Sequence, residues 1–426
     1  MLVKAITGFQ DILPDRAARF ARLEKTARDV FARYAYREIR VPEMEYTELF
    51  ARGIGQTTDI VEKEMFTLQD SKGRAMSLRP EGTAGVVRAF IENGLATQDP
   101  QARLFYMGAM FRHEKPQKGR FRQFHQIGAE AFGSEDALLD AEVIAMLMDI
   151  LREADVPGLR LEINSIGDDD SRGRFRKALV EYFEKHRDRL CKDCLRRLDT
   201  NPMRLLDCKV ESCIGIVRSA PTILPFLNDD CAAHFDSVQN YLRAFGVEFF
   251  VNERIVRGLD YYTRTAFEVT TDRLGAQNAV AGGGRYDGLV ESLGGPKVPG
   301  IGFAIGMERV VELMAERDED AAQTASIMLV PMDENARRVC VRLAAAIRAR
   351  GASCLVGVDG RSVKAQMKKA DRAGARFALV IGEKELEEKR VDVKDMGENR
   401  LAPDGITPED LAEMFAGAMA ESGSAS

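Results

Sequence analysis

The stretch MGAMFRHEKPQKGRFRQFHQIGAE, residues 107–130, predicts the centre of the fold. Two alternating runs flank a short loop that contains Pro116 and Gly119, and this pattern is typical of an antiparallel β-hairpin. Because successive side chains of a strand point to opposite faces, the second strand carries a polar pair on one face. That face holds Phe124, Gln126, Gly128 and Glu130, and the other holds His125, Ile127 and Ala129. Two polar side chains on an otherwise small or apolar face indicate a pocket.

The loop of this hairpin is strongly basic. Its cations are Lys115, Lys118 and Arg120, with Arg112 and Arg122 on the flanking strands. Only Glu114 opposes these five cations, which leaves a net charge of plus four. Such a density of positive charge suits a polyanion, although an edge hairpin kept soluble by charge would have the same composition.

The 426-residue chain is 45% hydrophobic and 30% charged, which predicts a globular protein of two or three domains. Its formal charge of −6 argues against unspecific coating of nucleic acid or membrane, so a nucleic-acid contact has to use local basic patches. The sequence shows no secretion signal and no apolar run near the roughly 18 residues that span a bilayer. Seven cysteines, an odd number, fit reduced thiols. We expect a cytoplasmic protein without a membrane contact.

Residues 14–35 predict a long amphipathic helix, because apolar side chains recur at helical spacing. Residues 37–41 then predict a short strand that stops at Pro42, as edge strands do. Together they suit a contact between subunits, and a helix packed only on its own domain explains the pattern equally well.

A strand at residues 75–78 and a helix at residues 84–91 flank the turn RPEGT. Glu81 and Thr83 lie at this turn. A carboxylate and a hydroxyl beside a helix start could hold an ammonium group or could cap the helix.

Residues 170–246 predict an inserted helical subdomain, because the composition changes to charged helices with four cysteines. These are Cys191, Cys194, Cys208 and Cys213. A Cys-x2-Cys followed by a Cys-x4-Cys resembles a zinc ribbon in ligand count. The residues between the two pairs look helical rather than knuckle-like, so no metal site is predicted, and zinc binding by these thiols stays open.

Two further segments of the predicted α+β domain, residues 1–324, have the polarity of a binding site. Residues 255–268, IVRGLDYYTRTAFE, alternate like a strand but are too polar for a core strand. Residues 281–289, AGGGRYDGL, do not have the glycine spacing of a phosphate-binding loop. We therefore expect these glycines to allow close approach of the backbone to a ligand or to a neighbouring strand. Residues 299–310 predict a glycine-rich strand that enters a helix, with Arg309 placed for an anion.

The remaining residues, 325–426, predict a separate α/β domain from their alternation of strands and helices. On one of its helices, Lys364, Lys368 and Arg372 recur every four residues and form a basic stripe. The stripe is either a phosphate contact or a solvated surface.

Several of these segments together resemble the class II aminoacyl-tRNA synthetases. The helix and strand that end at Pro42, FRHEKPQKGRFRQF and GIGFAIGMERV are similar to the three signature motifs of that class. RPEGT at 79–83 and RGLDYYTRTAFEV at 257–269 resemble the histidine-specific family within it. The resemblance covers essentially the full length. It implies an antiparallel catalytic sheet with flanking helices, the inserted subdomain, a C-terminal anticodon-binding domain and a homodimer.

The resemblance also implies the reaction, in which L-histidine is activated by ATP with Mg²⁺ and transferred to tRNA(His). It implies that Arg257 and Arg112 are catalytic at the α-phosphate. The ATP-binding residues that it implies are Arg112, Glu114, Arg120 and Arg309. Attack of a carboxylate on the α-phosphate needs positioning and charge neutralisation, so no protein nucleophile is required.

For the amino acid, the resemblance implies a histidine-binding set of Glu81, Thr83, Gln126, Glu130, Tyr261 and Tyr262. Neutral imidazole has one donor and one acceptor, which the Glu130 carboxylate and the Tyr262 hydroxyl match. In the hairpin loop, Gln117 and Lys118 are candidates for contact with tRNA, as is the basic stripe of the second domain.

Two other functions are alternatives. The regulatory subunit of ATP phosphoribosyltransferase resembles the same catalytic domain, but it lacks an anticodon-binding domain and commonly loses active-site residues, whereas this chain retains both. A plain nucleic-acid-binding module would use the basic hairpin and leave the polar pocket face unexplained.

Overall fold

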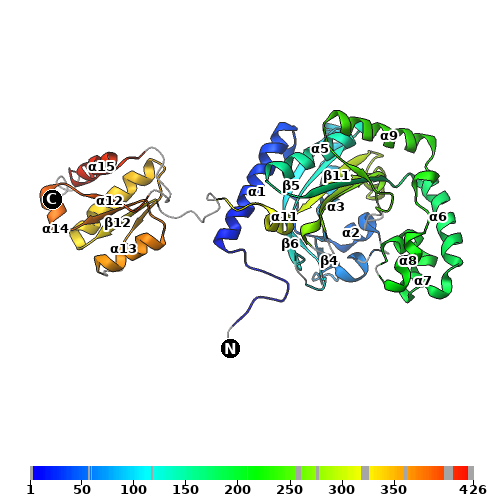
Figure 1. The fold of residues 1–426 in the computed structure, drawn as a ribbon, viewed down its shortest axis with the longest axis horizontal. Helices are drawn as coiled ribbons and strands as arrows, with labels where there is room; N and C mark the ends of the chain where they lie inside the picture. Colours follow the sequence, from blue (N-terminus) through cyan, green and yellow to red (C-terminus); the bar gives the residue numbers. More distant parts are fainter. Residues whose placement is uncertain are drawn as a thin grey trace. The chain divides into compact units, whose positions relative to one another are not determined.

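The structure is a computed structural model. The residues that it describes are 3–55, 58, 60–116, 119–208, 210–255, 261–274, 278–317, 326–358, 362–397 and 406–420. The chain divides into two compact units, Met1–Asp320 and Ala321–Ser426 (Figure 1). No helix in the described part of the chain is both long enough and apolar enough to cross a membrane.

In the first unit, the described residues form an eight-stranded sheet. Its strands, in spatial order, are β1 (Arg37–Glu38), β5 (Arg103–Phe111), β6 (Gln123–Phe132), β11 (Gly300–Gly306), β10 (Ala279–Arg285), β9 (Thr263–Thr271), β7 (Leu159–Ser165) and β8 (Phe250–Val251). The inner strands are antiparallel to one another, and the two short edge strands pair parallel to their neighbours.

The predicted hairpin is confirmed, because β5 and β6 pair antiparallel over their length, with Leu104 opposite Glu130. The alternation of side chains also follows the prediction. Ile127 and Ala129 point into the main hydrophobic core, whereas Gln126 and Glu130 line a cavity on the other face of the sheet. The face of β6 that carries the polar pair is therefore a pocket wall.

In the described part of the unit, four helices contribute to the core on one face of this sheet (Figure 1). They are α1 (Pro14–Arg33), α5 (Ala137–Glu153), α9 (Asp229–Ala244) and α11 (Met307–Leu313). The predicted apolar stripe of α1 is buried in this core, with Phe31 stacked on Phe105 at 4.4 Å between ring centroids. That stripe packs on its own domain, which was one of the two interpretations of the sequence.

The opposite face of the sheet is covered by α3 (Thr83–Glu92) and α10 (Leu289–Ser292), where Phe90 stacks on Phe132 at 4.2 Å. Smaller elements lie beside them. These are α2 (Thr47–Ile54), a π-helical turn (Ile60–Glu64), α4 (Leu95–Gln98), a 3₁₀ turn (Asp272–Leu274) and a three-stranded sheet of β2 (Met44–Tyr46), β4 (Ala75–Leu78) and β3 (Thr67–Gln69).

The helical insert packs around a second hydrophobic cluster, which also includes Ala266 of β9 and Tyr262 directly before that strand. It contains α6 (Asp169–Glu184), α7 (Lys192–Thr200), α8 (Glu211–Arg218) and 3₁₀ turns at Arg187–Arg189, Pro202–Asp207 and Leu224–Phe226, at one end of the unit (Figure 1). Its predicted C-terminal bound at residue 246 needs correction. The apolar side chains of α9, Phe235, Val238 and Leu242, belong to the main core, because this helix packs on α5.

The second unit has a four-stranded sheet in its described residues. Its strands are β13 (Cys354–Val356), β12 (Ile327–Pro331), β14 (Phe377–Ile381) and β15 (Val393–Asp395), and its helices are α12 (Glu334–Ala349), α13 (Val363–Arg372), α14 (Glu383–Glu388) and α15 (Pro408–Ala420). The first three strands are parallel, which confirms the predicted α/β alternation, whereas α14 and β15 were not predicted. On α13, Lys364, Lys368 and Arg372 are all exposed.

Candidate active site

A cavity of 230 Å³ opens on the face of the main sheet that carries Gln126 and Glu130. It brings together all the described residues that the sequence analysis assigned to histidine or ATP. They are Glu81, Thr83, Arg112, Glu114, Arg120, Gln126, Glu130, Tyr261, Tyr262 and Arg309. The other predicted site residues of this unit, Arg257, Gln117 and Lys118, lie outside the described residues.

The carboxyl group of Glu130 is 1% exposed, and two hydroxyls donate to it. Thr83 Oγ1 donates to one oxygen at 2.7 Å, and the Tyr286 hydroxyl donates to the other at 2.5 Å. Burial raises the pKa of Glu130 to about 8, and the two hydrogen bonds offset only part of this rise. Within the described part of the chain, no lysine or arginine forms an ion pair with this carboxyl group. Full ionisation of Glu130 at neutral pH therefore requires further donors, which a ligand can bring.

Gly302 of β11 lies opposite Glu130 in the register of the sheet. A Cβ at this position would lie 1.9 Å from Glu130 Oε2. Only glycine leaves the space that this carboxyl group occupies. The close approach expected of the glycines in residues 281–289 is found at Gly283, where a Cβ would lie 2.1 Å from the backbone oxygen of Gly302 on the neighbouring strand β11.

Glu81 and Gln126 supply further acceptor oxygens to the cavity. Glu81 accepts hydrogen bonds from the backbone N–H groups of Thr83 at 2.7 Å and Ala84 at 2.9 Å, so it caps α3 while it lines the cavity. Burial raises the pKa of this carboxyl group. The Oε1 atom of Gln126 is buried, and none of the described residues donates to it. An ammonium group, with three N–H donors, would satisfy such an oxygen.

The guanidinium groups of Arg112, Arg120 and Arg309 lie near one another in the lining of the cavity. Arg120 donates to the Glu114 carboxylate at 2.6 Å, and Arg112 Nε donates to the backbone carbonyl of Pro80 at 2.9 Å. Burial lowers the pKa of Arg309, and the positive charge of Arg120 lowers it further. Clustered, partly desolvated guanidiniums attract an anion that accepts bidentate hydrogen bonds, such as a phosphate.

Sequence reasoning missed two of the aromatic residues that line this cavity. The sequence motifs assign no role to Tyr286, although a tyrosine directly after a glycine-rich strand is a usable signal, because glycines leave room for a large neighbouring side chain. Phe124 was placed on the correct face without a function, and its ring lies 5.3 Å from the Arg112 guanidinium. It gives the cavity a flat apolar wall beside Arg112.

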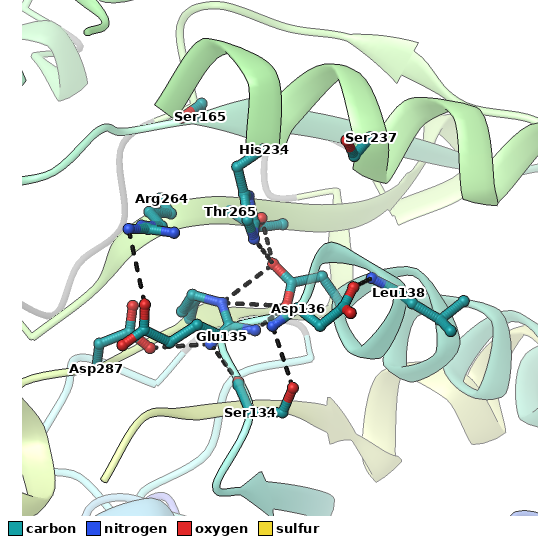
Figure 2. Close-up of polar contacts among 12 residues, drawn as sticks. Ser134, Glu135, Asp136, Leu138, Ser165, His234, Ser237, Arg264, Thr265 and Asp287 are labelled. Carbon is teal, nitrogen blue, oxygen red and sulfur yellow. Dashed lines mark hydrogen bonds and ion pairs between the residues drawn. The ribbon is translucent and has the colours of Figure 1, made fainter. Parts of the chain in front are cut away.

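Next to Tyr286 in the sequence, a buried ion pair holds the end of β10. Arg285 and Asp140 are both fully buried, and Arg285 Nε donates to Asp140 Oδ1 at 3.1 Å. The Thr265 hydroxyl donates to Oδ2 at 2.5 Å, and His234 Nε2 lies 3.6 Å from the same oxygen (Figure 2). Burial lowers the pKa of His234. Because residues 285 and 286 are consecutive, the ion pair fixes the segment that presents Tyr286 to the cavity.

Comparisons with known proteins agree with this geometry. The family profile of histidyl-tRNA synthetase matches residues 8–310. The chain belongs to the histidyl-tRNA synthetase family. The profile of the anticodon binding domain matches residues 326–416. The fold class predicted from the sequence and the predicted activity of a histidine–tRNA ligase are therefore confirmed.

Individual members of the histidyl-tRNA synthetase family match nearly the whole chain. The histidine–tRNA ligase of Halothermothrix orenii is 50% identical over 398 residues, which cover 93% of this chain and 95% of that protein. The one of Trichlorobacter lovleyi is 48% identical and covers 98% of this chain and 99% of its own. The crystal structure of the apo histidyl-tRNA synthetase of S. aureus has a TM-score of 0.80 at 38% identity, and the match covers 97% of this chain and 100% of that one.

A more distant structure bears on the regulatory alternative. It is described as an ATP phosphoribosyltransferase regulatory subunit/histidyl-tRNA synthetase from Bacillus halodurans C, and it covers 90% of this chain and 99% of its own with a TM-score of 0.66. Its identity is 22%, so this likeness shows the fold alone. It lends the regulatory alternative no functional support.

Proposed function

We propose that this chain forms histidyl-adenylate from L-histidine and ATP in the cavity of the first unit and transfers the histidyl group to tRNA(His). The observation that carries the proposal is the combination of two kinds of charged group in the lining of one cavity. The buried carboxyl groups of Glu81 and Glu130 and the guanidinium groups of Arg112, Arg120 and Arg309 all line it. An amino acid held by the carboxyl groups and a triphosphate held by the guanidinium groups would place a carboxylate beside the α-phosphate.

The residues around Glu130 and Glu81 have the donors and acceptors that histidine needs. We assign Glu130 as the acceptor of one imidazole N–H and Tyr262 as the donor to the other ring nitrogen, with Tyr261 packed beside Tyr262 at 4.7 Å between ring centroids. Gln126 and Glu81 would accept the α-ammonium N–H groups. A site built from buried polar partners rejects analogues that leave those partners unpaired, by up to about 10⁴ to 10⁵.

The arginine side chains of the cavity would perform the charge neutralisation that adenylate formation requires. The histidine carboxylate oxygen attacks the α-phosphorus, the bond to the bridging oxygen breaks, and pyrophosphate leaves. Arg112 would stabilise charge on the α-phosphate, while Arg120 and Arg309 would hold the outgoing phosphates. We add Arg257 to this group from the family motif RGLDYYTRTAFEV. In the second step, a ribose hydroxyl at the tRNA 3′ end attacks the carbonyl carbon and AMP leaves.

We propose Mg²⁺ as the metal that accompanies ATP. The carboxylates of Glu114 and Glu268 border the cavity, and carboxylate oxygen is a ligand that Mg²⁺ prefers. Bound Mg²⁺ would neutralise charge on the phosphate oxygens. The protein itself supplies both cationic and anionic side chains around the proposed phosphate position, as in the Arg120–Glu114 ion pair.

Contact with tRNA would involve both units. We assign the exposed stripe of Lys364, Lys368 and Arg372 to phosphates of the anticodon arm, and Gln117 and Lys118 to the acceptor end. Changing the stripe to glutamate should weaken tRNA binding and reduce the slope of log K against log salt by about one unit for each lost phosphate contact. Filter binding over a salt series measures this, and an unchanged slope would show that the stripe is a solvated surface.

We also infer a cytoplasmic homodimer. All seven cysteines are free thiols, as expected in a reducing compartment. The small sheet beside α3 exposes the apolar side chains of Met44, Tyr46 and Leu68, which a second copy would cover. Sedimentation equilibrium tests this inference, and a monomer mass at working concentration would contradict it.

Histidine-dependent exchange of pyrophosphate into ATP tests the proposed chemistry. The parent protein should exchange only with L-histidine. Arg257→Ala should lower the rate a hundredfold or more, because loss of one preorganised charge-stabilising donor costs about 2.7 to 4 kcal/mol of barrier. Arg160→Ala is the matched control, since this exposed arginine pairs with Glu162 at 3.1 Å and does not line the cavity. Equal rates for the two variants would refute the role of Arg257, and no exchange by the parent would refute the proposal.

A further inference from the structure

The helical insert brings four thiols to one point, although its sequence separates them into two pairs. All four sulfur atoms, those of Cys191, Cys194, Cys208 and Cys213, lie within 4.8 Å of one another. In each pair, the first cysteine precedes a helix, α7 or α8, and the second lies on that helix. The helical character that argued against a zinc ribbon in the sequence is therefore compatible with convergence of the thiols.

The spacing of the sulfurs matches a tetrahedral metal site rather than a disulfide. Four sulfurs at about 2.3 Å from a central Zn²⁺ form a tetrahedron with edges of about 3.8 Å. The Sγ atoms of Cys191 and Cys208 are 3.9 Å apart. A disulfide bond between two of these cysteines would need a sulfur separation of about 2.0 Å.

The backbone around the thiols favours thiolate ligands. The N–H of Cys191 donates to the sulfur of Cys213 at 3.2 Å, and the N–H of Cys194 donates to the sulfur of Cys191 at 3.5 Å. Amide donors directed at sulfur stabilise negative charge there and orient the ligands of a metal. Cysteines that merely fill a core have no need of such donors.

The location of the cluster indicates what a metal would do. Cys194 and Cys213 are fully buried in the core of the insert, and all four positions are occupied by protein sulfur. A zinc ion with four protein ligands has no open position for a substrate, which is the arrangement of structural sites. It would tie α7 and α8 to the 3₁₀ turn at Pro202–Asp207, in a part of the chain whose helices are short.

We propose that the insert binds one structural Zn²⁺ through Cys191, Cys194, Cys208 and Cys213. The thiols lose their protons on binding, and each thiolate forms one bond to the metal without a change of oxidation state. The site is separate from the cavity and does not depend on the proposed roles of the cavity residues. Its effect is to hold the insert folded.

Metal analysis of the full-length protein, expressed with zinc in the medium and purified without a metal-binding tag, tests the proposal. We expect about one zinc ion per chain in the parent. Cys208→Ser should lose most of the zinc. Cys231→Ser is the matched control, because Cys231 is a buried thiol of the same unit outside the cluster, and it should keep the zinc. A zinc-free parent, or equal zinc in Cys208→Ser and Cys231→Ser, would overturn the proposal.

A second measurement does not depend on the folding of any variant. Replacing zinc by Co²⁺ in the parent protein should give the intense sulfur-to-metal charge-transfer absorption of a tetrahedral thiolate site. Addition of a chelator to the zinc protein should lower its thermal midpoint, and zinc should restore it. An octahedral Co²⁺ spectrum, or a thermal midpoint that changes with neither the chelator nor zinc, would show that the four thiols are packed without a metal.

Discussion

Glu130 and Asp140 are both buried carboxyl groups of the first unit, and they differ in their partners. Glu130 is 1% exposed, and among the described residues it accepts hydrogen bonds from hydroxyl groups alone. Asp140 is 0% exposed and faces the guanidinium of Arg285. Equal burial therefore produces two different electrostatic states.

The difference separates a binding group from a structural one. A buried carboxylate that already has a cation is neutralised within the fold, and its remaining task is to hold the elements that it joins. A buried carboxyl group with hydroxyl partners alone keeps its proton near neutral pH, as the raised pKa of Glu130 indicates. It becomes an acceptor when a ligand supplies donors, which is the role that we propose for it toward imidazole.

Removal of the cation from Asp140 should have the largest effect. Arg285→Met leaves Asp140 buried without a cation and should destabilise the first unit by about 3 to 5 kcal/mol. Urea unfolding followed by circular dichroism measures the shift. The control is Arg33→Met, because Arg33 pairs with Glu153 at 2.5 Å and both side chains are exposed, and such a surface pair contributes only about 0 to 1 kcal/mol.

Replacement of both partners sharpens this test. Asp140→Leu combined with Arg285→Met should recover much of the stability lost in Arg285→Met, because the isolated charge is then gone. If Arg285→Met unfolds at the same urea concentration as the parent, the Arg285–Asp140 ion pair does not stabilise the fold. Asp140 would then not differ from Glu130 in having a structural role.

The sequence predicted local features of this region well. The alternation in residues 123–130 placed Gln126 and Glu130 on the cavity face, because a strand's period of two is independent of its neighbours. It could not show which residues of other elements meet them. Tyr286 reaches Glu130 across 156 positions, and Arg285 reaches Asp140 across 145 positions. Such pairs depend on sheet order and register, which local patterns do not encode.

The same limit explains the other differences. The helix α9 was assigned to the insert because its charged composition resembles that of the insert, and only its packing on α5 shows where it belongs. The short elements α14 and β15 carry too few residues for a periodic pattern. The roles of the cavity residues follow from family motifs rather than from local patterns. The spacing of the four cysteines of the insert is visible in the sequence, but only the fold shows that their sulfur atoms lie close together.

The second prediction concerns the proton on Glu130. The pKa of this group is about 8 in the folded protein, against an ordinary value of about 4.3. If the carboxylate accepts an N–H from neutral imidazole, histidine binding releases that proton below pH 8. The histidine affinity should then rise about tenfold per pH unit between about pH 6.5 and 8, and flatten above pH 8. Titration calorimetry in buffers of different ionisation enthalpy measures both the affinity and the proton release.

Glu130→Gln is the control for this pH dependence, since it has no proton to release in this range. Its affinity for histidine should be lower and flat above the pKa of free imidazole, while ATP binding should change little. The stability of the free protein should change with pH in the opposite direction to the histidine affinity. A carboxyl group with a raised pKa favours folding below its unfolded pKa and loses that contribution as pH rises through about 8, so the parent should lose thermal stability relative to Glu130→Gln over this range. A parallel pH profile for both proteins would contradict the assignment.

The smallest effect is expected at Tyr286, which bonds to Glu130 and directly follows Arg285, the partner of Asp140. Tyr286→Phe removes one of the two hydroxyl donors to Glu130 but leaves the ring packed in the core and the Arg285 ion pair intact. Loss of one such hydrogen bond costs about 0.5 to 1.5 kcal/mol, so histidine affinity should fall by up to roughly tenfold. The hydrogen bond from Tyr286 stabilises the charged form of Glu130, so its loss should raise the pKa of Glu130 further. The pH at which the histidine affinity levels off should rise with that pKa.

The matched control for Tyr286→Phe is Tyr36→Phe. The Tyr36 hydroxyl is buried in the main core and has no hydrogen-bond partner among the described residues, so its removal should change neither affinity nor stability appreciably. Calorimetry over the pH series and the urea midpoint together decide the role of Tyr286. If Tyr286→Phe instead lost as much stability as Arg285→Met while its pH profile stayed that of the parent, Tyr286 would belong with Asp140 as a structural group. Residues 285 and 286 would then both have a structural role and no role in histidine binding.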